Sequence, residues 1–278
     1  MPTTRRTIVL AGILAGFAAA SRALPGTETL VQRDWLARGA MGSALIHFPP
    51  PSATGLAPVL FVFHGEDTTI PKTADTAGFH EPMTKAARTW AFHELWPEAI
   101  VVYPQSMWLP APGDAGSLIP HWEESPGGAD YDLGLFDAIL ASLIKESHAD
   151  SRRVYAMGYS NGGSFTYVLW AQRGDLLAAV APCAAITSSL LPALKPKPFF
   201  AVAGENDQTL KFSWQKGVIG TLLRRNECDA TQPLKPRVVT HPSRIGAPVM
   251  TLIHGGGHEL PPEVPAMIVA FFKAQARP

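Results

Sequence analysis

The sequence is poor in cysteine, has no charge excess and has few long apolar runs. Its 278 residues include only two cysteines, which excludes a zinc ribbon or a multi-disulfide scaffold. The 23 basic and 23 acidic side chains leave no cationic excess to hold a phosphate backbone, so nucleic acid is not expected as a partner. No histidine and cysteine spacing is typical of a metal site. We therefore expect neither a metal nor a cofactor.

The longest apolar run lies near the N-terminus and has the pattern of an export signal. Arg5 and Arg6 precede the apolar residues 8–20, which end in a small-residue, A-x-A-like site. This pattern predicts a secretory signal peptide over residues 1–23, and the paired arginines resemble a twin-arginine signal. A retained membrane anchor is the alternative, although the run is shorter than the roughly 20 residues that span a bilayer. We predict an exported, periplasmic or extracellular protein with no membrane span after processing.

The rest of the chain alternates between apolar, β-rich segments and helical patterns. Continuous apolar runs suit strands that are covered on both faces of a parallel sheet. The expected strands span 58–63, 100–103, 153–157, 178–181, 199–202 and 249–253, with an earlier antiparallel strand at 40–48. Apolar residues at helical spacing predict helices over 133–146, from 161 through 170, over 211–226 and over 264–275. The alternation predicts a single α/β domain, residues 24–278, with a mostly parallel central sheet and helices on both faces.

One stretch, residues 104–128, does not fit this alternation. It is rich in proline and glycine, and it contains Trp108, His121 and Trp122. A long irregular segment after a strand often carries function, so Trp108 and Trp122 are candidate substrate-binding residues. A surface excursion whose aromatic rings pack for stability is the alternative. Trp214 is a further ring that belongs either to a pocket or to the core.

The most informative motif is Gly158-Tyr159-Ser160-Asn161-Gly162, which matches G-x-S-x-G. It follows a predicted strand and precedes a predicted helix, the context that a nucleophile elbow requires. The flanking glycines remove Cβ atoms that would clash where strand and helix approach each other. The helix that follows aims its N-terminal amides at developing negative charge. The pattern predicts Ser160 as a catalytic nucleophile; a glycine-rich turn with an incidental serine is the alternative.

A serine hydroxyl needs a general base, and in this fold an acid and then a histidine follow the serine. His258 is the preferred base because three glycines carry it away from the last strand. His254, still at the strand end, is the alternative. Asp207 follows strand 199–202 and is the preferred acid, which would hold the imidazole tautomer. Glu205 is the alternative acid, and Asp207 would otherwise serve only as a helix cap.

Two backbone amides are expected to form the oxyanion hole. Asn161 follows the nucleophile and would supply one of them. Glu66, which follows His64 and Gly65 in the loop after strand 58–63, would supply the other. Losing one such donor typically costs a factor on the order of 10²–10³ in rate. Glu66 would contribute only its backbone amide, because its carboxylate beside an oxyanion would be unfavourable unless it points away.

Taken together, these motifs resemble those of the polyhydroxybutyrate depolymerase and feruloyl esterase group of α/β hydrolases. The resemblance covers roughly residues 40–276. Its markers are Phe63-His64-Gly65, Tyr103-Pro104, His121-Trp122-Glu123, Asp132-Leu133, Arg152-Arg153-Val154-Tyr155, Gly158 to Gly163, Gly204 with Asp207, Asn226-Glu227-Cys228 and Gly255-Gly256-Gly257-His258. It implies the α/β-hydrolase fold and hydrolysis of carboxylic esters through an acyl-enzyme. Ser160, Asp207 and His258 take the triad positions.

The resemblance leaves the substrate open. The family often has Gly-His-Thr-Trp-Pro-Gly at the catalytic histidine, where this chain has Gly257-His258-Glu259-Leu260-Pro261-Pro262. The missing tryptophan weakens any transfer of polymer or aromatic-acid preference. The expected partners are small-molecule or oligomeric esters: small esters, hydroxyalkanoate oligomers or feruloyl-type esters. An acyltransferase or peptidase with the same triad, and a catalytically idle binding protein on the same scaffold, are the competing hypotheses.

An exported protein could pair its two cysteines, but the predicted topology favours free thiols. Cys183 should lie near the carboxyl end of a strand, whereas Cys228 should follow a helix that runs back to the other end of the sheet. A disulfide needs Cα atoms within about 7 Å of each other. The predicted topology separates the two residues further than this.

Overall fold

The computed structural model of the protein describes residues 29–50, 55–66, 81–111, 114–125, 127–229 and 237–278. The predicted signal peptide, residues 1–23, lies outside these ranges. No helix within the described ranges has the length and apolar character needed to cross a bilayer.

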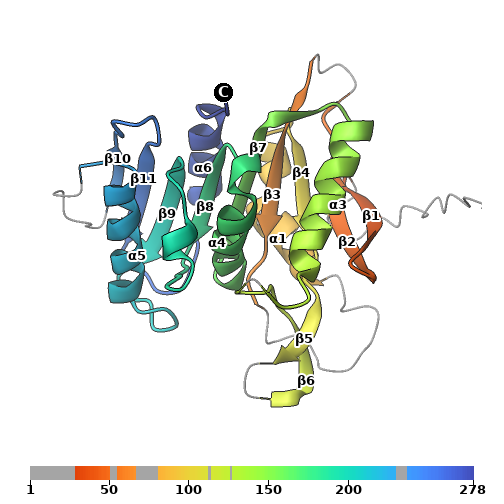
Figure 1. Ribbon diagram of the computed structural model, residues 1–278, viewed down its shortest axis with the longest axis horizontal. Coiled ribbons are helices and arrows are strands. Elements are labelled where there is room, and N and C mark those ends of the chain that lie inside the picture. Colours follow the sequence, from red (N-terminus) through yellow and green to blue (C-terminus); the bar gives the residue numbers. More distant parts are fainter. Residues whose placement is uncertain (1–28, 51–54, 67–80, 112–113, 126, 230–236) are drawn as a thin grey trace, which may run out of the picture.

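A nine-stranded sheet in the order β1-β2-β4-β3-β7-β8-β9-β11-β10 forms the centre of the molecule (Figure 1). Its six inner strands from β4 to β11 run parallel, which confirms the predicted mostly parallel sheet. They are β3 (Ala57–Phe63), β4 (Ile100–Pro104), β7 (Ala149–Tyr159), β8 (Ala179–Cys183), β9 (Phe199–Gly204) and β11 (Val249–His254). Antiparallel strands complete both edges: β1 (Val31–Ala37), β2 (Ala40–His47) and β10 (Arg237–His241).

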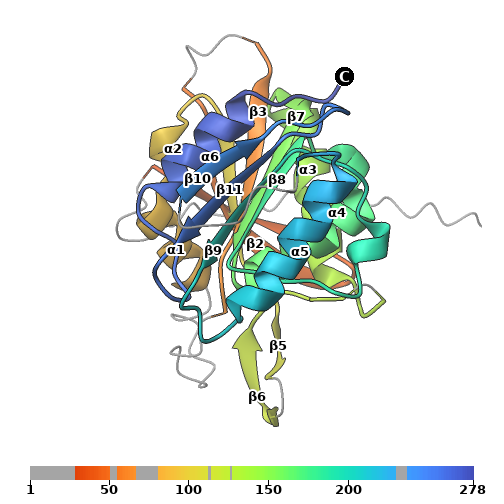
Figure 2. The same ribbon diagram turned by 90° about the vertical axis from the view of Figure 1, so that its left-hand side faces the viewer.

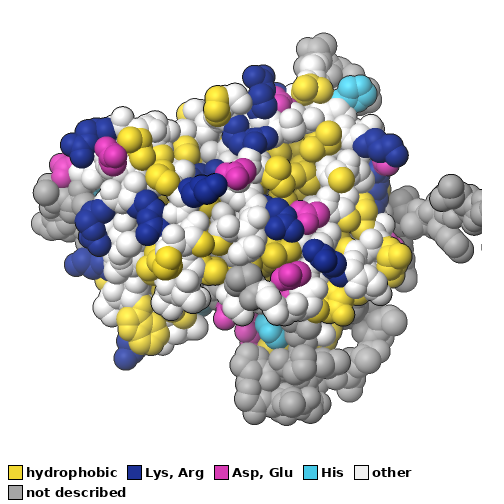
Figure 3. Space-filling model, in the orientation of Figure 1, with side chains coloured by type: hydrophobic (Ala, Val, Ile, Leu, Met, Phe, Trp, Pro, Cys, Tyr) yellow, Lys and Arg dark blue, Asp and Glu magenta, His cyan; other side chains and the backbone are white. Residues whose placement is uncertain are grey.

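Helices cover both faces of the sheet, as predicted (Figure 2). One face carries α3 (Tyr131–Glu146), α4 (Asn161–Arg173) and α5 (Phe212–Arg225), and the other carries α1 (Glu81–Trp90), α2 (Phe92–Leu95) and α6 (Val264–Lys273). Two short 3₁₀ turns, η1 (Gly174–Leu176) and η2 (Leu191–Ala193), join these elements. On the face with α3 to α5, cationic and anionic side chains are interspersed (Figure 3), and Arg173 pairs with Asp137 at 2.7 Å.

The apolar run of β3 explains why the sheet is buried on both sides. Every residue of this strand is buried. Val59, Phe61 and Phe63 pack into the core under α3 to α5, while Leu60 and Val62 pack into the core under α1 and α6. Because successive side chains of a strand point to opposite faces, a continuous apolar run serves two cores at once.

The stretch 104–128 is not irregular throughout, which corrects the sequence prediction. It contains a two-stranded sheet, β5 (Trp108–Ala111) paired antiparallel with β6 (Asp114–Pro120), which projects beyond the main sheet (Figure 1). Proline is depleted in strands because it cannot donate to the ladder, so Pro110 and Pro120 concealed this hairpin. The edge strands β1 and β10 and the helices α1 and α2 were likewise not predicted.

Both cysteines are buried and unpaired, which confirms the expectation of free thiols. Cys183 ends β8, and Cys228 follows α5, as the predicted topology requires.

Candidate active site

The carboxyl ends of parallel strands bring the predicted site residues to one edge of the sheet. Ser160 follows β7, Asp207 follows β9 and His258 follows β11. The loop at His64 follows β3, which lies beside β7. Residues that are far apart in the sequence therefore meet because the carboxyl ends of these parallel strands lie at the same edge of the sheet.

Ser160 sits at a sharp turn between β7 and α4 with a backbone φ of +56°. A non-glycine residue in this region stores on the order of 1–3 kcal/mol of strain, which the surrounding packing must hold. A Cβ at Gly158 would lie 2.0 Å from the Gly162 carbonyl oxygen, and a Cβ at Gly162 would lie 2.3 Å from the His64 carbonyl oxygen. The two glycines of the motif are thus required by close backbone approach, as the sequence indicated.

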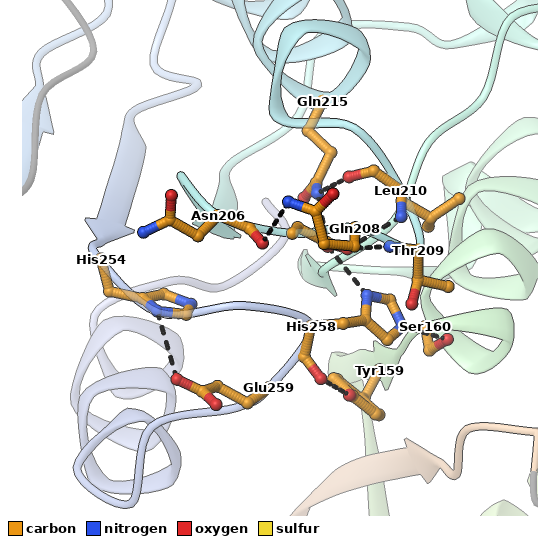
Figure 4. Close-up of polar contacts among 11 residues, drawn as sticks. Tyr159, Ser160, Asn206, Gln208, Thr209, Leu210, Gln215, His254, His258 and Glu259 are labelled. Carbon is orange, nitrogen blue, oxygen red and sulfur yellow. Dashed lines mark hydrogen bonds and ion pairs between the residues drawn. The ribbon is translucent and has the colours of Figure 1, made fainter.

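The three predicted triad side chains form one continuous line of hydrogen bonds, of which Figure 4 labels Ser160 and His258. His258 Nε2 lies 2.7 Å from Ser160 Oγ, and His258 Nδ1 lies 2.8 Å from Asp207 Oδ2. In this arrangement Nδ1–H donates to the carboxylate and Nε2 accepts the serine proton. The geometry equips Ser160 for deprotonation by His258.

The Asp207 carboxylate is fully enclosed and held by several donors. Its Oδ1 accepts the backbone N–H groups of Thr209 and Leu210, each at 2.8 Å, and Gln215 Nε2 donates to Oδ2 at 2.9 Å. Burial alone would raise the pKa of Asp207, but hydrogen bonds from His258 and from the two amides outweigh it and hold the pKa below its ordinary value. Asp207 therefore stays ionised, and it caps the chain before α5 while it also orients His258.

The alternative acid and base occupy other places. His254 remains at the end of β11, where its Nδ1 accepts the Gly256 N–H at 3.2 Å and lies 3.9 Å from Glu259 (Figure 4). Glu205 is exposed, and its backbone N–H donates to the His254 carbonyl oxygen at 2.8 Å. Both residues shape the loops that carry the triad.

The loop after β3 is shaped by the ring of His64. The Ser106 N–H donates to His64 Nε2 at 3.2 Å, so Nε2 is an acceptor and the ring hydrogen is assigned to Nδ1. Nδ1–H then donates to the Gly65 carbonyl oxygen at 2.8 Å. Because the C=O and N–H of a trans peptide point in opposite directions, the Glu66 amide points away from the His64 ring.

Both predicted oxyanion donors border the nucleophile. A pocket of about 360 Å³ is lined by Ser160, Asn161 and Glu66. Asn161 is the first residue of α4, and the first N–H groups of a helix have no intrahelical partner. The role of both amides as oxyanion donors stays a prediction, and the Glu66 side chain is exposed.

The predicted substrate contact of Trp122 is wrong, because its side chain is only 1% exposed. Its ring lies in the core, 5.1 Å from the Phe63 ring and 5.2 Å from the Phe165 ring between centroids. The proline-rich segment re-enters the core here, which composition alone does not reveal. Trp108 is half-buried at the start of β5, and Trp214 on α5 is 51% exposed beneath the Lys211 ammonium.

Tyr159 is a site residue that the sequence reasoning did not select. Its hydroxyl donates to the His258 carbonyl oxygen at 2.5 Å, and its ring lies 5.3 Å from the His258 ring. Burial raises the pKa of Tyr159 to about 12, so the hydroxyl keeps its proton near neutral pH. The sequence offered one sign of this role, since Tyr159 directly precedes Ser160 in the G-x-S-x-G motif.

Two pockets flank the triad. The pocket of about 360 Å³ beside Ser160 is rich in hydroxyl groups, which come from Ser164, Thr187, Ser188, Ser189 and Thr209. A second pocket of about 330 Å³ lies beside His258 and includes the larger side chains of Lys85, Trp90, Tyr159 and Leu260. In the part of the chain that the structure describes, no three His, Cys, Asp or Glu side chains are grouped to hold a metal ion.

No family model matches the chain, but individual relatives do. The bifunctional acetylxylan esterase/xylanase XynS20E of Neocallimastix patriciarum is 32% identical over 137 residues, which are 49% of this chain and 19% of that protein. Feruloyl esterase D of Neurospora crassa is 26% identical over 136 residues, 46% of this chain and 47% of that protein. The chain thus spans less than half the length of either relative. The match to a feruloyl esterase confirms the predicted resemblance to the feruloyl esterase group.

Two solved structures of esterases have a fold similar to that of this chain. An acetyl xylan esterase from Aspergillus awamori matches with a TM-score of 0.57 at 16% identity over 87% of this chain and 98% of that chain. A glucuronoyl esterase from Solibacter usitatus matches with a TM-score of 0.61 at 14% identity over 92% and 88% of the two chains. At these identities the likeness concerns the fold, and it confirms the predicted α/β-hydrolase architecture.

Proposed function

We propose that this α/β hydrolase is an exported serine esterase that cleaves carboxylic esters through an acyl-enzyme on Ser160. The observation that carries the proposal is the unbroken line from Ser160 Oγ through His258 to Asp207, with contacts of 2.7 and 2.8 Å. The esterase names of the relatives support the same chemistry.

The reaction follows from the positions of these groups. His258 Nε2 removes the Ser160 proton as Oγ attacks the ester carbonyl carbon, and Asp207 stabilises the imidazolium that forms. The amides of Glu66 and Asn161 hold the tetrahedral oxyanion. His258 then protonates the departing alcohol, the C–O ester bond breaks, and a water molecule activated by His258 hydrolyses the acyl-enzyme.

The substrate range follows from the two pockets beside the triad. The hydroxyl-rich pocket at Ser160 suits polar groups, whereas Trp90, Tyr159 and Leu260 offer apolar surface in the pocket beside His258. This pairing supports small esters, hydroxyalkanoate oligomers and feruloyl-type esters as substrate classes. A panel that compares hydroxybutyrate oligomers, feruloyl esters and acetylated sugars separates them.

The decisive test is hydrolysis of short p-nitrophenyl esters by the mature protein and by Ser160→Ala. Removal of the nucleophile is expected to lower kcat by a factor of up to about 10⁶. Ser151→Ala is the matched control, because Ser151 lies exposed on the same strand β7 at a distance from the site. Equal activity of the wild type and Ser160→Ala, or no activity in either, refutes the proposal.

The competing functions give different results. A fluorophosphonate that labels Ser160 eliminates an idle binding protein, because labelling needs an activated nucleophile. An acyltransferase or peptidase is recognised by products formed with added alcohol or amine acceptors. Export is tested by N-terminal sequencing of the protein recovered outside the cytoplasm, where cleavage near residue 23 is expected.

A further inference from the structure

Trp122 contacts both loops that carry the predicted oxyanion amides. Its indole Nε1 donates to the His64 carbonyl oxygen at 2.8 Å. Its backbone N–H donates to Asn161 Oδ1 at 2.7 Å, and Asn161 Nδ2 donates back to the Trp122 carbonyl oxygen at 3.2 Å. One residue thus joins the loop before Glu66 to the first residue of α4.

The Trp122 ring is wedged between the same two elements. It stacks on Phe165 of α4 with an interplanar angle of 19° and meets Phe63 of β3 nearly edge-on at 77°. Phe63 directly precedes His64, and Phe165 lies four residues after Asn161, about one helical turn. A ring that is held from both sides fixes the direction of its N–H as well as its own position.

The backbone around Trp122 is also anchored to α3. The Glu123 N–H donates to Asp132 Oδ2 at 2.8 Å, and Asp132 is a buried residue of the first turn of α3. Glu124 Oε1 accepts a second hydrogen bond from Asn161 Nδ2 at 3.0 Å. Trp122 is therefore part of a segment with its own fixed attachment to the fold.

We propose that Trp122 is a positioning residue that sets the separation of the Glu66 and Asn161 amides by tying the His64 loop to Asn161. The inference rests on the proposed esterase function. Oxyanion donors act only when they lie about 2.7–3.1 Å from the developing charge, and a shift of about 1 Å can cost about a hundredfold in rate. The Glu66 amide belongs to the loop after β3 and the Asn161 amide to the start of α4, so a side chain that joins these two segments controls the spacing of the amides.

Trp122→Phe tests this link because it keeps an aromatic ring and removes the indole N–H that donates to the His64 carbonyl oxygen. The expected result is a fall in kcat of about 10- to 100-fold with KM within a few-fold, since the amides act mainly on the transition state. The affinity for an alkyl boronic acid, whose tetrahedral adduct places an oxygen at the same amides, should fall in parallel. Unchanged kcat in a folded Trp122→Phe protein overturns the proposal.

Trp170→Phe is the matched control. Trp170 is a buried residue of α4. Its Nε1 donates to the Lys195 carbonyl oxygen at 3.0 Å, away from the triad. This control should lose a similar amount of thermal stability and keep its kcat. If both variants lose kcat equally, the effect is general loosening and the proposal fails.

Asn161→Ala removes the side-chain hydrogen bonds between Asn161 and the Trp122 backbone and keeps the Asn161 backbone amide. If Trp122 acts by linking the His64 loop to Asn161, a protein with both Trp122→Phe and Asn161→Ala loses about as much activity as the worse single variant, because either change alone already breaks the link. Losses that multiply mean independent effects and overturn the proposal. Should Trp122→Phe not fold, Asn161→Ala alone decides: it must lower kcat at nearly constant KM. An inactive wild type refutes the proposed function itself, which is a separate result.

Discussion

The two sides of Ser160 are built in different ways. On the acid–base side, Asp207 and His258 act through their own side chains, which line up through two short hydrogen bonds. On the oxyanion side, the proposed donors are the backbone amides of Glu66 and Asn161, and Trp122, which we propose sets their positions, donates hydrogen bonds to His64 and Asn161. Chemistry carried by side chains is visible as residue types in a sequence, whereas chemistry carried by backbone depends on packing that a sequence shows only indirectly.

Asp207→Asn is expected to have a large effect on the acid–base side. An amide at this position favours the wrong tautomer of His258, and kcat is expected to fall by a factor of about 10⁴. Steady-state kinetics on a p-nitrophenyl ester measure the loss, with KM nearly unchanged.

Glu205→Gln is the control for this change, because Glu205 is exposed two residues earlier in the same loop. It should keep nearly full kcat. If the two variants lose activity equally, the carboxylate of Asp207 has no special part, and the contrast between the two sides of Ser160 disappears.

On the oxyanion side, Asp132 holds the segment of Trp122 through the Glu123 N–H, and its carboxyl group should make the stability of the protein depend on pH. Burial, helped by the nearby Glu123 carboxylate, raises the pKa of Asp132 to about 7 against the opposing hydrogen bonds from the Glu123 and Met107 amides. The folded state therefore binds more protons than the unfolded state between the unfolded pKa of 3.8 and the folded pKa of about 7. The stability from protonated Asp132 is complete below about pH 4 and is lost as the pH rises through about 7.

Asp132→Asn should remove this dependence. Each pKa unit corresponds to about 1.4 kcal/mol, so the Tm of the wild type should fall by several degrees relative to the variant between about pH 4 and pH 8. Thermal melts across this range measure the difference. Asp175→Asn, a change at an exposed carboxylate, serves as the control and should follow the wild type. Parallel curves for wild type and Asp132→Asn contradict the prediction.

The same contrast explains which parts of the fold were predictable. The inner strands and the glycines of the elbow follow from apolar runs and from backbone approach at Gly158 and Gly162. The hairpin of β5 and β6 does not, because its proline content lowers every local strand signal. Trp122 was assigned to the substrate because an aromatic residue in an irregular segment has no period that reveals which way it faces. Its burial becomes visible only when Phe63 and Phe165 are brought together.

The smallest expected effect concerns His254, which competed with His258 for the role of base. Its Nδ1 accepts one backbone hydrogen bond from Gly256, so His254→Ala should cost about 1 kcal/mol of stability and change kcat by less than about threefold. His258→Ala, measured beside it, should lose a factor on the order of 10⁶ because the general base is removed. If His254→Ala instead lowers kcat more than tenfold with KM unchanged, the loop between the two histidines positions His258 as strictly as Trp122 is proposed to position the amides. The acid–base side would then depend on backbone shape as well.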